Sequence, residues 1–403
     1  MRKIFIFLFL FFSATMLNAQ TKKKDLATAK SYLKSGTNLQ KAEELISNLL
    51  KDSANRQESK IWVVLFDAVK KQYEQVNEQL YLKQQSDTSN LFVSARKMFL
   101  VAEGLDSLEN TPGKNGKVKL KYRGKNSGLL DAYRANLYNG GVFFLGKQKY
   151  QEAFDFFDTY IDCAKQPLFS SYDYLNKDKR LPRAASFAVY CGYKQKNAAL
   201  TLKHSQLALR DTAALEKVYK YLAETYEANG DTAIYLSTLE KGFKLYPKSS
   251  YFFPYLFDFH YRKGDYDASL KLCDKALKAD SINQVAMFAR SSVLLCLENF
   301  DECIAQCDRL IALNDKFADA YLNAGLAYFN QAAKMDGDAS LSRKYHSKIL
   351  ALYKKAMPYM QHYRSLVPDA KDKWALPLYT IYLNLNMGKE FDEIDSMLKM
   401  KSK

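Results

Sequence analysis

Two stretches, 264-GDYDASLKLCDKALKADS-281 and 298-ENFDECIAQCDRLIALND-315, follow one pattern at an interval of 34 residues. A third copy, 230-GDTAIYLSTLEKGFKLYP-247, precedes them at the same interval. Aromatic, small and aliphatic residues coincide when the last two copies are superposed, in four pairs: Tyr266 and Phe300, Leu270 and Ile304, Cys273 and Cys307, Leu277 and Ile311. A fixed interval of this length indicates a repeat architecture, because each unit buries its apolar face only against its neighbours.

Five consecutive units keep this register without a gap and begin at Pro182, Glu216, Ser250, Gln284 and Ala318. The unit from Glu216 shows the full set of packing positions, namely Tyr219, Leu222, Ala223, Tyr226, Tyr235, Leu239, Gly242 and Pro247. This spacing resembles the tetratricopeptide repeat (TPR), a helix-turn-helix of 34 residues. The resemblance implies an all-α fold, a TPR-type α-solenoid in which antiparallel helix pairs stack into a right-handed superhelix.

An earlier unit begins at Arg134 and carries Gly140 and Gly141 inside its first expected helix. A glycine within a helix costs about 1 kcal/mol relative to alanine. The resemblance places both glycines where the paired helices approach most closely, which accounts for their presence.

The remaining segments are arranged around this array. We expect a signal peptide at 1–19, an N-terminal helical and degenerate TPR-like region at 23–110, a basic linker at 111–128, and the TPR array at 134–403, with insertions near 168–181 and 331–348 and a C-terminal capping helix pair. Within the N-terminal region we expect two long helices, separated near Ser86 and Asp87.

The first residues, MRKIFIFLFLFFSATMLNAQ, have the composition of a secretory leader. A positive start, an apolar run from Ile4 to Phe12 and a small-residue site ending at Ala19 are typical of a cleaved signal peptide. No later stretch is apolar enough to span a bilayer, so we expect an exported chain, soluble after cleavage and most simply periplasmic. The chain also resembles exported TPR proteins of Gram-negative bacteria, and that resemblance implies no activity.

The net charge of +16 falls by two when Arg2 and Lys3 leave with the leader. An exported protein rarely meets nucleic acid, so we expect no nucleic-acid partner despite the basic balance. The segment 114-KNGKVKLKYRGK-125 concentrates positive charge and alternates it with apolar residues. We expect a short strand or extended arm there, followed by a turn at 126–128. It is either a surface linker or a contact for a membrane surface or an acidic partner.

The cysteines near 300 raise the question of a metal or redox site. Cys303 and Cys307 fall at packing positions of a second helix, Cys273 takes the same position as Cys307 one repeat earlier, and Cys296 ends a first helix. Because free cysteine behaves as a small apolar residue, we expect all four to be packed thiols. Pairing of Cys273 with Cys303 or Cys307 remains an alternative in an exported protein. Zinc-type spacings and catalytic motifs are absent and the four histidines are scattered, so we expect no metal, no cofactor and no enzyme.

The TPR resemblance also indicates where a partner would bind. In peptide-binding TPR modules, positions 2, 5, 9 and 12 of the first helices face a concave groove. These positions and their neighbours give our candidate groove residues: Arg183, Tyr190, Tyr193, Lys217, Lys220, Glu224, Tyr251, Tyr255, Asp258, Tyr261 and Arg262. Tyrosine rings and fixed donors suit an extended peptide because they bind at a low entropic cost.

The leading hypothesis is therefore a non-enzymatic, exported TPR scaffold for a protein or peptide. Packing of these aromatic residues against neighbouring repeats is the structural alternative. A carbohydrate-binding component of an outer-membrane uptake system is the alternative function.

Overall fold

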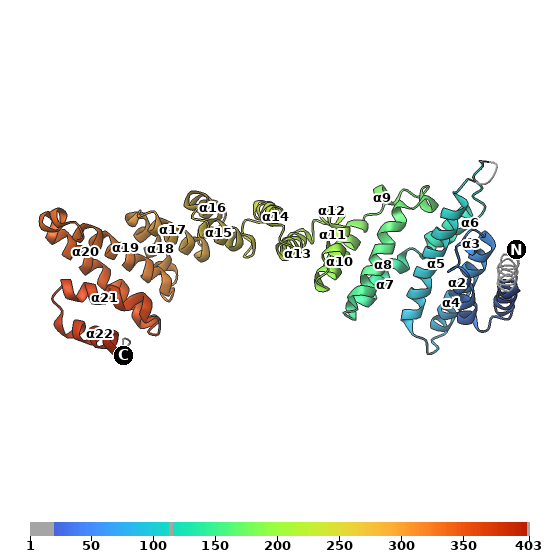
Figure 1. Cartoon of the computed structure of the whole chain (residues 1–403), viewed down its shortest axis with the longest axis horizontal. Helices are drawn as coiled ribbons and strands as arrows, with labels where there is room; N and C mark the ends of the chain where they lie inside the picture. Colours follow the sequence, from blue (N-terminus) through green and yellow to red (C-terminus); the bar gives the residue numbers. More distant parts are fainter. Residues whose placement is uncertain (1–19, 113–115, 401–403) are drawn as a thin grey trace, which may run out of the picture. The chain divides into compact units, whose positions relative to one another are not determined.

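The computed structural model describes residues 20–112 and 116–400 (Figure 1). The expected leader at 1–19 lies outside them. Over the described residues the chain is helical and contains no strand, which confirms the all-α, TPR-type expectation. None of these helices is both long and apolar enough to traverse a lipid bilayer. The chain divides into two compact units, Met1–Asp231 and Thr232–Lys403, so the division falls inside the repeat that begins at Glu216.

Unit 1 begins with a helix over 20–35 and continues through helices that pack in sequence order. Their bounds are α2 Leu39–Leu49, α3 Ser53–Arg56, α4 Ser59–Tyr81, α5 Thr88–Glu109, α6 Arg123–Tyr133, α7 Ala135–Gly146, α8 Tyr150–Asp162, α9 Tyr174–Lys177, α10 Leu181–Lys194, α11 Ala198–Lys203, α12 Ser205–Ala208 and α13 Leu215–Ala228, with short 3-10 turns η1 Cys163–Lys165 and η2 Pro167–Phe169. The break expected near Ser86 is present, because the Asp87 side chain caps α5 by accepting from the Ser89 amide.

The glycine pair in α7 is explained by the approach of α8. A Cβ on Gly141 would lie 2.6 Å from Phe157, and one on Gly140 would lie 2.7 Å from Phe156. Real Cβ atoms do not approach other atoms so closely, so only glycine lets the two helices meet here. The expectation of a close helix approach is confirmed.

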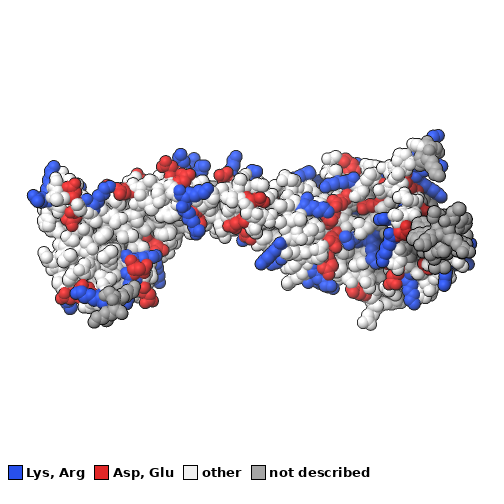
Figure 2. Space-filling model, viewed as in Figure 1, with Lys and Arg blue, Asp and Glu red and all other residues white. Residues whose placement is uncertain are grey.

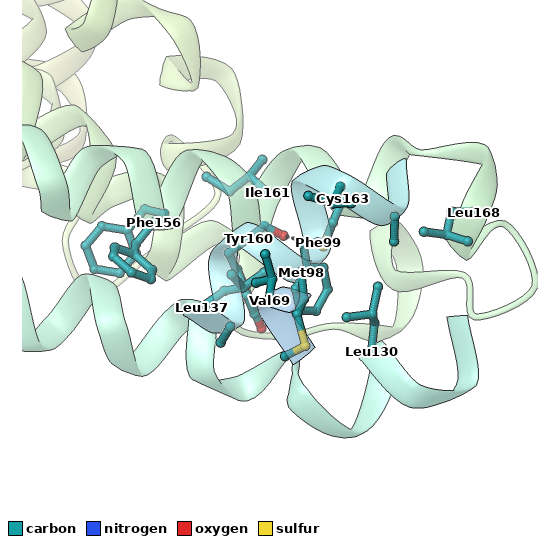
Figure 3. Close-up of a cluster of buried hydrophobic side chains, with 14 of the residues drawn as sticks. Val69, Met98, Phe99, Leu130, Leu137, Phe156, Tyr160, Ile161, Cys163 and Leu168 are labelled. Atoms are coloured by element: carbon teal, nitrogen blue, oxygen red, sulfur yellow. Dashed lines mark hydrogen bonds between the residues drawn. The ribbon is translucent and has the colours of Figure 1, made fainter. Parts of the chain in front are cut away.

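The core of unit 1 is continuous from one helix pair to the next. Figure 3 shows side chains of α4, α5, α7 and α8 meeting the segment that follows α8. Met98, Phe99, Leu130 and Leu137 are fully buried there, and Phe99 stacks on Phe169 of η2 at 5.6 Å between ring centroids. The insertion near 168–181 is therefore folded onto the core rather than left as a free loop.

A buried arginine holds this insertion in place. The guanidinium of Arg134 lies between the rings of Tyr160 and Tyr174, at 3.9 and 4.0 Å from their centroids. Its Nη1 donates to Oδ2 of Asp178 at 2.5 Å, and its Nε lies 3.2 Å from Sγ of Cys163. Both charged side chains are about nine-tenths buried, at 9% and 11% exposure. We call these five residues the Arg134 cluster.

The expectation for residues 126–128 was wrong. The helix α6 begins at Arg123, so Asn126, Ser127 and Gly128 lie within it and form no turn. Arg123 makes a two-pronged ion pair with Asp106 of α5, at 2.7 and 2.8 Å, which fixes the start of α6. The described part of the preceding basic segment, 117–120, is neither strand nor helix.

Unit 2 continues the same helix-turn-helix pattern. Its helices are α14 Thr232–Leu245, α15 Phe252–Arg262, α16 Tyr266–Ala279, α17 Gln284–Cys296, α18 Phe300–Leu313, α19 Ala318–Asp336, α20 Ala339–Leu366, α21 Lys371–Asn384 and α22 Gly388–Met400. The insertion expected near 331–348 is helical, because it extends α19 to 19 residues and α20 to 28. Extra residues thus lengthen a helix pair instead of forming a loop.

The cysteines answer the question raised by the sequence. All six are free thiols, so the disulfide alternative is not supported. Cys273, Cys303 and Cys307 are fully buried, as expected. Cys296 was expected to be packed but is exposed, because it is the last residue of α17 and lies beyond Leu294, the last residue of that helix that is buried.

Candidate functional site

A hollow of about 300 Å³ lies between α10 and α13 in unit 1. We call it the α10–α13 hollow. It is lined by Leu145, Arg183, Ser186, Phe187, Tyr190, Ala213, Ala214, Lys217, Val218 and Tyr221. Three of the predicted groove residues, Arg183, Tyr190 and Lys217, therefore share one concave surface.

The helical period places these side chains together. Arg183, Phe187 and Tyr190 are spaced by four and three residues, so they share one face of α10. The opposite face of α10 supplies Ala184, Ala188 and Cys191 to the core. Pro182 lies in the first turn of α10, where its missing N–H costs little. Lys217 and Tyr221 are one turn apart on α13 and face the same hollow.

Two cations border the hollow, but their environments differ. Nε of Arg183 lies 3.2 Å from Oδ2 of Asp211, which is only 8% exposed. The charge of Arg183 is therefore compensated. Lys217 is exposed and forms no ion pair within the described part of the chain. The hollow consequently has one uncompensated positive charge, at Lys217.

Tyrosine rings form one wall of the hollow. The ring of Tyr221 lies 5.5 Å from that of Tyr190 and 4.5 Å from that of Tyr193, centroid to centroid. Tyr150 of α8 extends the row by an edge contact with Tyr190 at 6.1 Å. Such contacts stabilise the rings in fixed orientations, which lowers the entropy that a bound ligand must remove. Part of this aromatic surface therefore serves repeat packing, as the structural alternative expected.

The other predicted residues of unit 1 border an adjoining hollow of about 430 Å³. Tyr193 and Glu224 line it, and the Tyr193 hydroxyl donates to Oε2 of Glu224 at 2.5 Å. This hydrogen bond, with some burial, raises the pKa of Tyr193 to about 12, so the phenol stays neutral. Lys220 lies 3.9 Å from Glu224 on the same helix, which makes the pair mutually compensating.

The predicted residues of unit 2 belong to α15 and to the residue before it. The rings of Tyr251 and Tyr255 are 4.8 Å apart, and Tyr255 is 45% exposed. Asp258 and Arg262 form an exposed ion pair at 2.8 Å, while the Tyr261 hydroxyl lies 3.2 Å from Sγ of Cys296. These five form a surface of their own in unit 2.

Two features of the α10–α13 hollow were missed from the sequence. Tyr221 and Phe187 occupy position 6 of their repeats, and Tyr255 occupies it in the next. An aromatic residue at one position of three successive units was an available signal. Asp211, the partner of Arg183, lies between repeats, and no pattern pointed to it.

A third group of polar side chains was also missed. His204 Nε2 lies 2.7 Å from Oδ1 of Asp158, and Asp162 completes a set whose ligand atoms lie within 4.8 Å of one another. The amine of Lys203 already occupies this position, at 2.5 Å from Asp158 and 3.2 Å from Asp162. Burial disfavours ionisation of Asp158, but hydrogen bonds from His204 and Lys203 outweigh it and lower its pKa. We interpret the group as an ion-pair network with Lys203 as its cation.

Over the face drawn in Figure 2, basic and acidic side chains are interspersed on both units. The net positive charge is therefore not gathered into one basic patch on that face, which does not favour a nucleic-acid interface.

Comparisons with known proteins agree with the helical fold. Scans against family models and against curated protein sequences gave no match. Among solved structures, the C-terminal part of a TPR repeat-containing protein from Cytophaga hutchinsonii is 12% identical, covers 64% of this chain and 92% of its own, and has a TM-score of 0.42. Yeast Tom70 is 12% identical over 90% of this chain and 88% of its own, with a TM-score of 0.35. The MamA protein is 15% identical over 48% and 96%, with a TM-score of 0.34. These likenesses are low, so the assignment of TPR-type repeats depends on the helices and register described above.

Proposed function

We propose that the protein is a non-catalytic TPR-type scaffold that binds an extended peptide segment of a protein partner in the α10–α13 hollow. The observation that carries the proposal is the joint placement of Tyr190, Tyr221 and the uncompensated Lys217 around one concave surface. Peptide amides need hydrogen-bond partners when they leave water. Arg183, Ser186 and the tyrosine hydroxyls supply donors and acceptors for them.

The chemistry of the hollow favours an acidic peptide with an aromatic or aliphatic side chain. Lys217 would attract a carboxylate, and the rings of Tyr190 and Tyr221 would cover an apolar side chain. Because both rings are already held by neighbouring tyrosines, little side-chain entropy is lost on binding.

We also propose that this binding occurs outside the cytoplasm after residues 1–19 have been removed. The support is the arrangement of charged, apolar and small residues in that segment. N-terminal sequencing of the protein from an envelope fraction checks this. A chain that still begins at Met1 and remains in the cytoplasm would refute it.

A peptide-display selection against the full mature chain tests the binding proposal. Selected peptides are then measured against the wild type, Tyr190→Ala, Lys217→Glu and the matched control Lys30→Glu, which reverses an exposed lysine far along the chain. We expect Tyr190→Ala and Lys217→Glu each to weaken binding about tenfold and Lys30→Glu to leave it unchanged. Equal binding to all four proteins would show that the hollow is not the site.

The same hollow allows a direct comparison with the carbohydrate alternative. Half-exposed tyrosine rings also stack on sugar rings, so a panel of acidic oligosaccharides is measured in parallel. Saturable oligosaccharide binding that Tyr190→Ala removes, with no peptide selected, would replace the peptide proposal by the carbohydrate one.

A further inference from the structure

A larger hollow, of about 730 Å³, lies in unit 2 between α14, α15 and α16. Its floor includes Phe243, Leu256 and Leu272, and its rim carries Lys244, Lys271 and Lys275. We call it the lysine-rimmed hollow. None of these residues belongs to the surfaces described above.

The repeat pattern explains why space is left here. The residue at position 11 of the repeat is Tyr226 in the unit from Glu216 and Tyr328 in the unit from Ala318. In the unit from Ser250 the same position is His260, whose ring is smaller and lies 3.6 Å from Oδ2 of Asp265. The volume that a tyrosine would fill between the two second helices therefore stays open.

The charge of the rim is unbalanced. Lys271 and Lys275 are one turn apart on α16, and Lys244 faces them from α14. All three are exposed, and none forms an ion pair within the residues that the structure describes. Glu240 is the one acidic residue that lines the hollow. Three lysines and one carboxylate leave the rim positive.

The lining lacks what a peptide backbone requires. No asparagine, glutamine, serine, threonine, tyrosine or arginine lines this hollow, in contrast to the α10–α13 hollow. A peptide would leave its amides without partners there. A hydrocarbon chain has no such groups, and lysine attracts an anionic head without demanding a fixed geometry. The lysine stems add apolar surface to the walls.

We propose that the lysine-rimmed hollow binds a single-chain amphiphile with an anionic head group, such as an alkyl carboxylate. The chain would lie along Phe243, Leu256 and Leu272, and the carboxylate would lie among the three lysine amines. The volume is within the range of small-molecule sites in proteins. This site is independent of the proposed peptide-binding function.

Calorimetric titration of the full mature chain tests the proposal with laurate, kept below its micelle concentration. We expect one laurate per chain, and binding of decanoate weaker by roughly five- to tenfold because two methylene groups are lost. Dodecyltrimethylammonium has the same chain and the opposite charge, and we expect at least tenfold weaker binding. Equal binding of the cation and the anion, or no laurate binding, would overturn the proposal.

Three variants locate the site. Lys271→Glu should weaken laurate binding at least tenfold, whereas Lys278→Glu should not, because Lys278 is exposed on the same helix but does not line the hollow. Ala268→Trp should abolish binding by filling the hollow without a change of charge. Circular dichroism establishes that each variant is folded. Laurate binding that survives Ala268→Trp in a folded protein, or displacement of laurate by an oligoglutamate peptide of equal affinity, would refute the assignment.

Discussion

Replacing Arg134 with methionine removes the cation that joins the insertion after α8 to the core of unit 1. The lost ion pair with Asp178 is about nine-tenths buried on both sides. Removing one partner of a buried pair costs roughly 3–5 kcal/mol, because the remaining charge is left without compensation. Each of the two tyrosine contacts adds about 0.5–2 kcal/mol, and the methionine side chain, which packs well against rings, offsets part of this. We expect a net loss of about 4 kcal/mol.

The loss should be local, so the assay must resolve regions of the chain. Repeat arrays can unfold segment by segment, and one global transition does not report on one cluster. We therefore choose hydrogen exchange read by mass spectrometry for peptides that span 160–181. A local loss of about 4 kcal/mol corresponds to exchange faster by roughly a thousandfold. Peptides from unit 2 provide the internal control.

A second variant distinguishes the buried charge from simple packing. Arg134→Met combined with Asp178→Leu removes both charges, and such apolar replacements of buried pairs are often close to neutral. We expect the double variant to recover most of the lost protection. Arg134→Lys should give an intermediate loss, because lysine keeps the charge but not the planar fork. A loss below about 1 kcal/mol for Arg134→Met, or a double variant as unstable as the single one, would refute the reasoning.

Three further predictions follow from single positions. Oε1 of Glu103 is buried without a hydrogen-bond partner, and burial together with Asp162 raises the pKa of this carboxyl to about 8. A raised carboxyl pKa contributes stability below the unfolded value of 4.5 that is lost as pH rises toward 8, so Glu103→Gln should unfold like the wild type at pH 4.5 and be more stable by about 2–4 kcal/mol at pH 9; parallel curves would contradict this. Gly192→Ala should lower the melting temperature of unit 1, since its Cβ would lie 2.3 Å from the Thr201 amide nitrogen, whereas Gly146→Ala, with open space around it, should not; equal melting would exclude the clash. A thiol reagent should modify Cys296 alone in the folded protein and all six cysteines in denaturant, as counted by mass; rapid reaction of Cys303 would show that its burial is misassigned.

The period of 34 residues was sufficient to predict the helices of the array and the burial of Cys273, Cys303 and Cys307. It also predicted which face of α10 would be free, because positions 2 and 9 of a repeat fall on one side of a helix. These are local properties, determined by spacing along the chain.

What could not be predicted depends on contacts between residues far apart in sequence. Asp211 compensates Arg183 across 28 positions, and Asp158 meets His204 across 46. The start of α6 depends on Asp106, which no local rule connects to Arg123. The exposure of Cys296 was missed for a different reason, since a helix boundary uncertain by one turn decides whether its last residue is covered.

The long pair formed by α19 and α20 has a practical consequence for engineering. Between them, Gly337 closes α19 through a hydrogen bond from its amide to the Ala333 carbonyl, and Asp338 caps α20. Both ends are thus satisfied within their own helix, and the surrounding residues 337–341 are exposed. A fluorescent protein or an affinity tag spliced between Gly337 and Asp338 should leave every repeat intact, which makes this tip an internal tagging point for a chain whose leader precludes a label at its start.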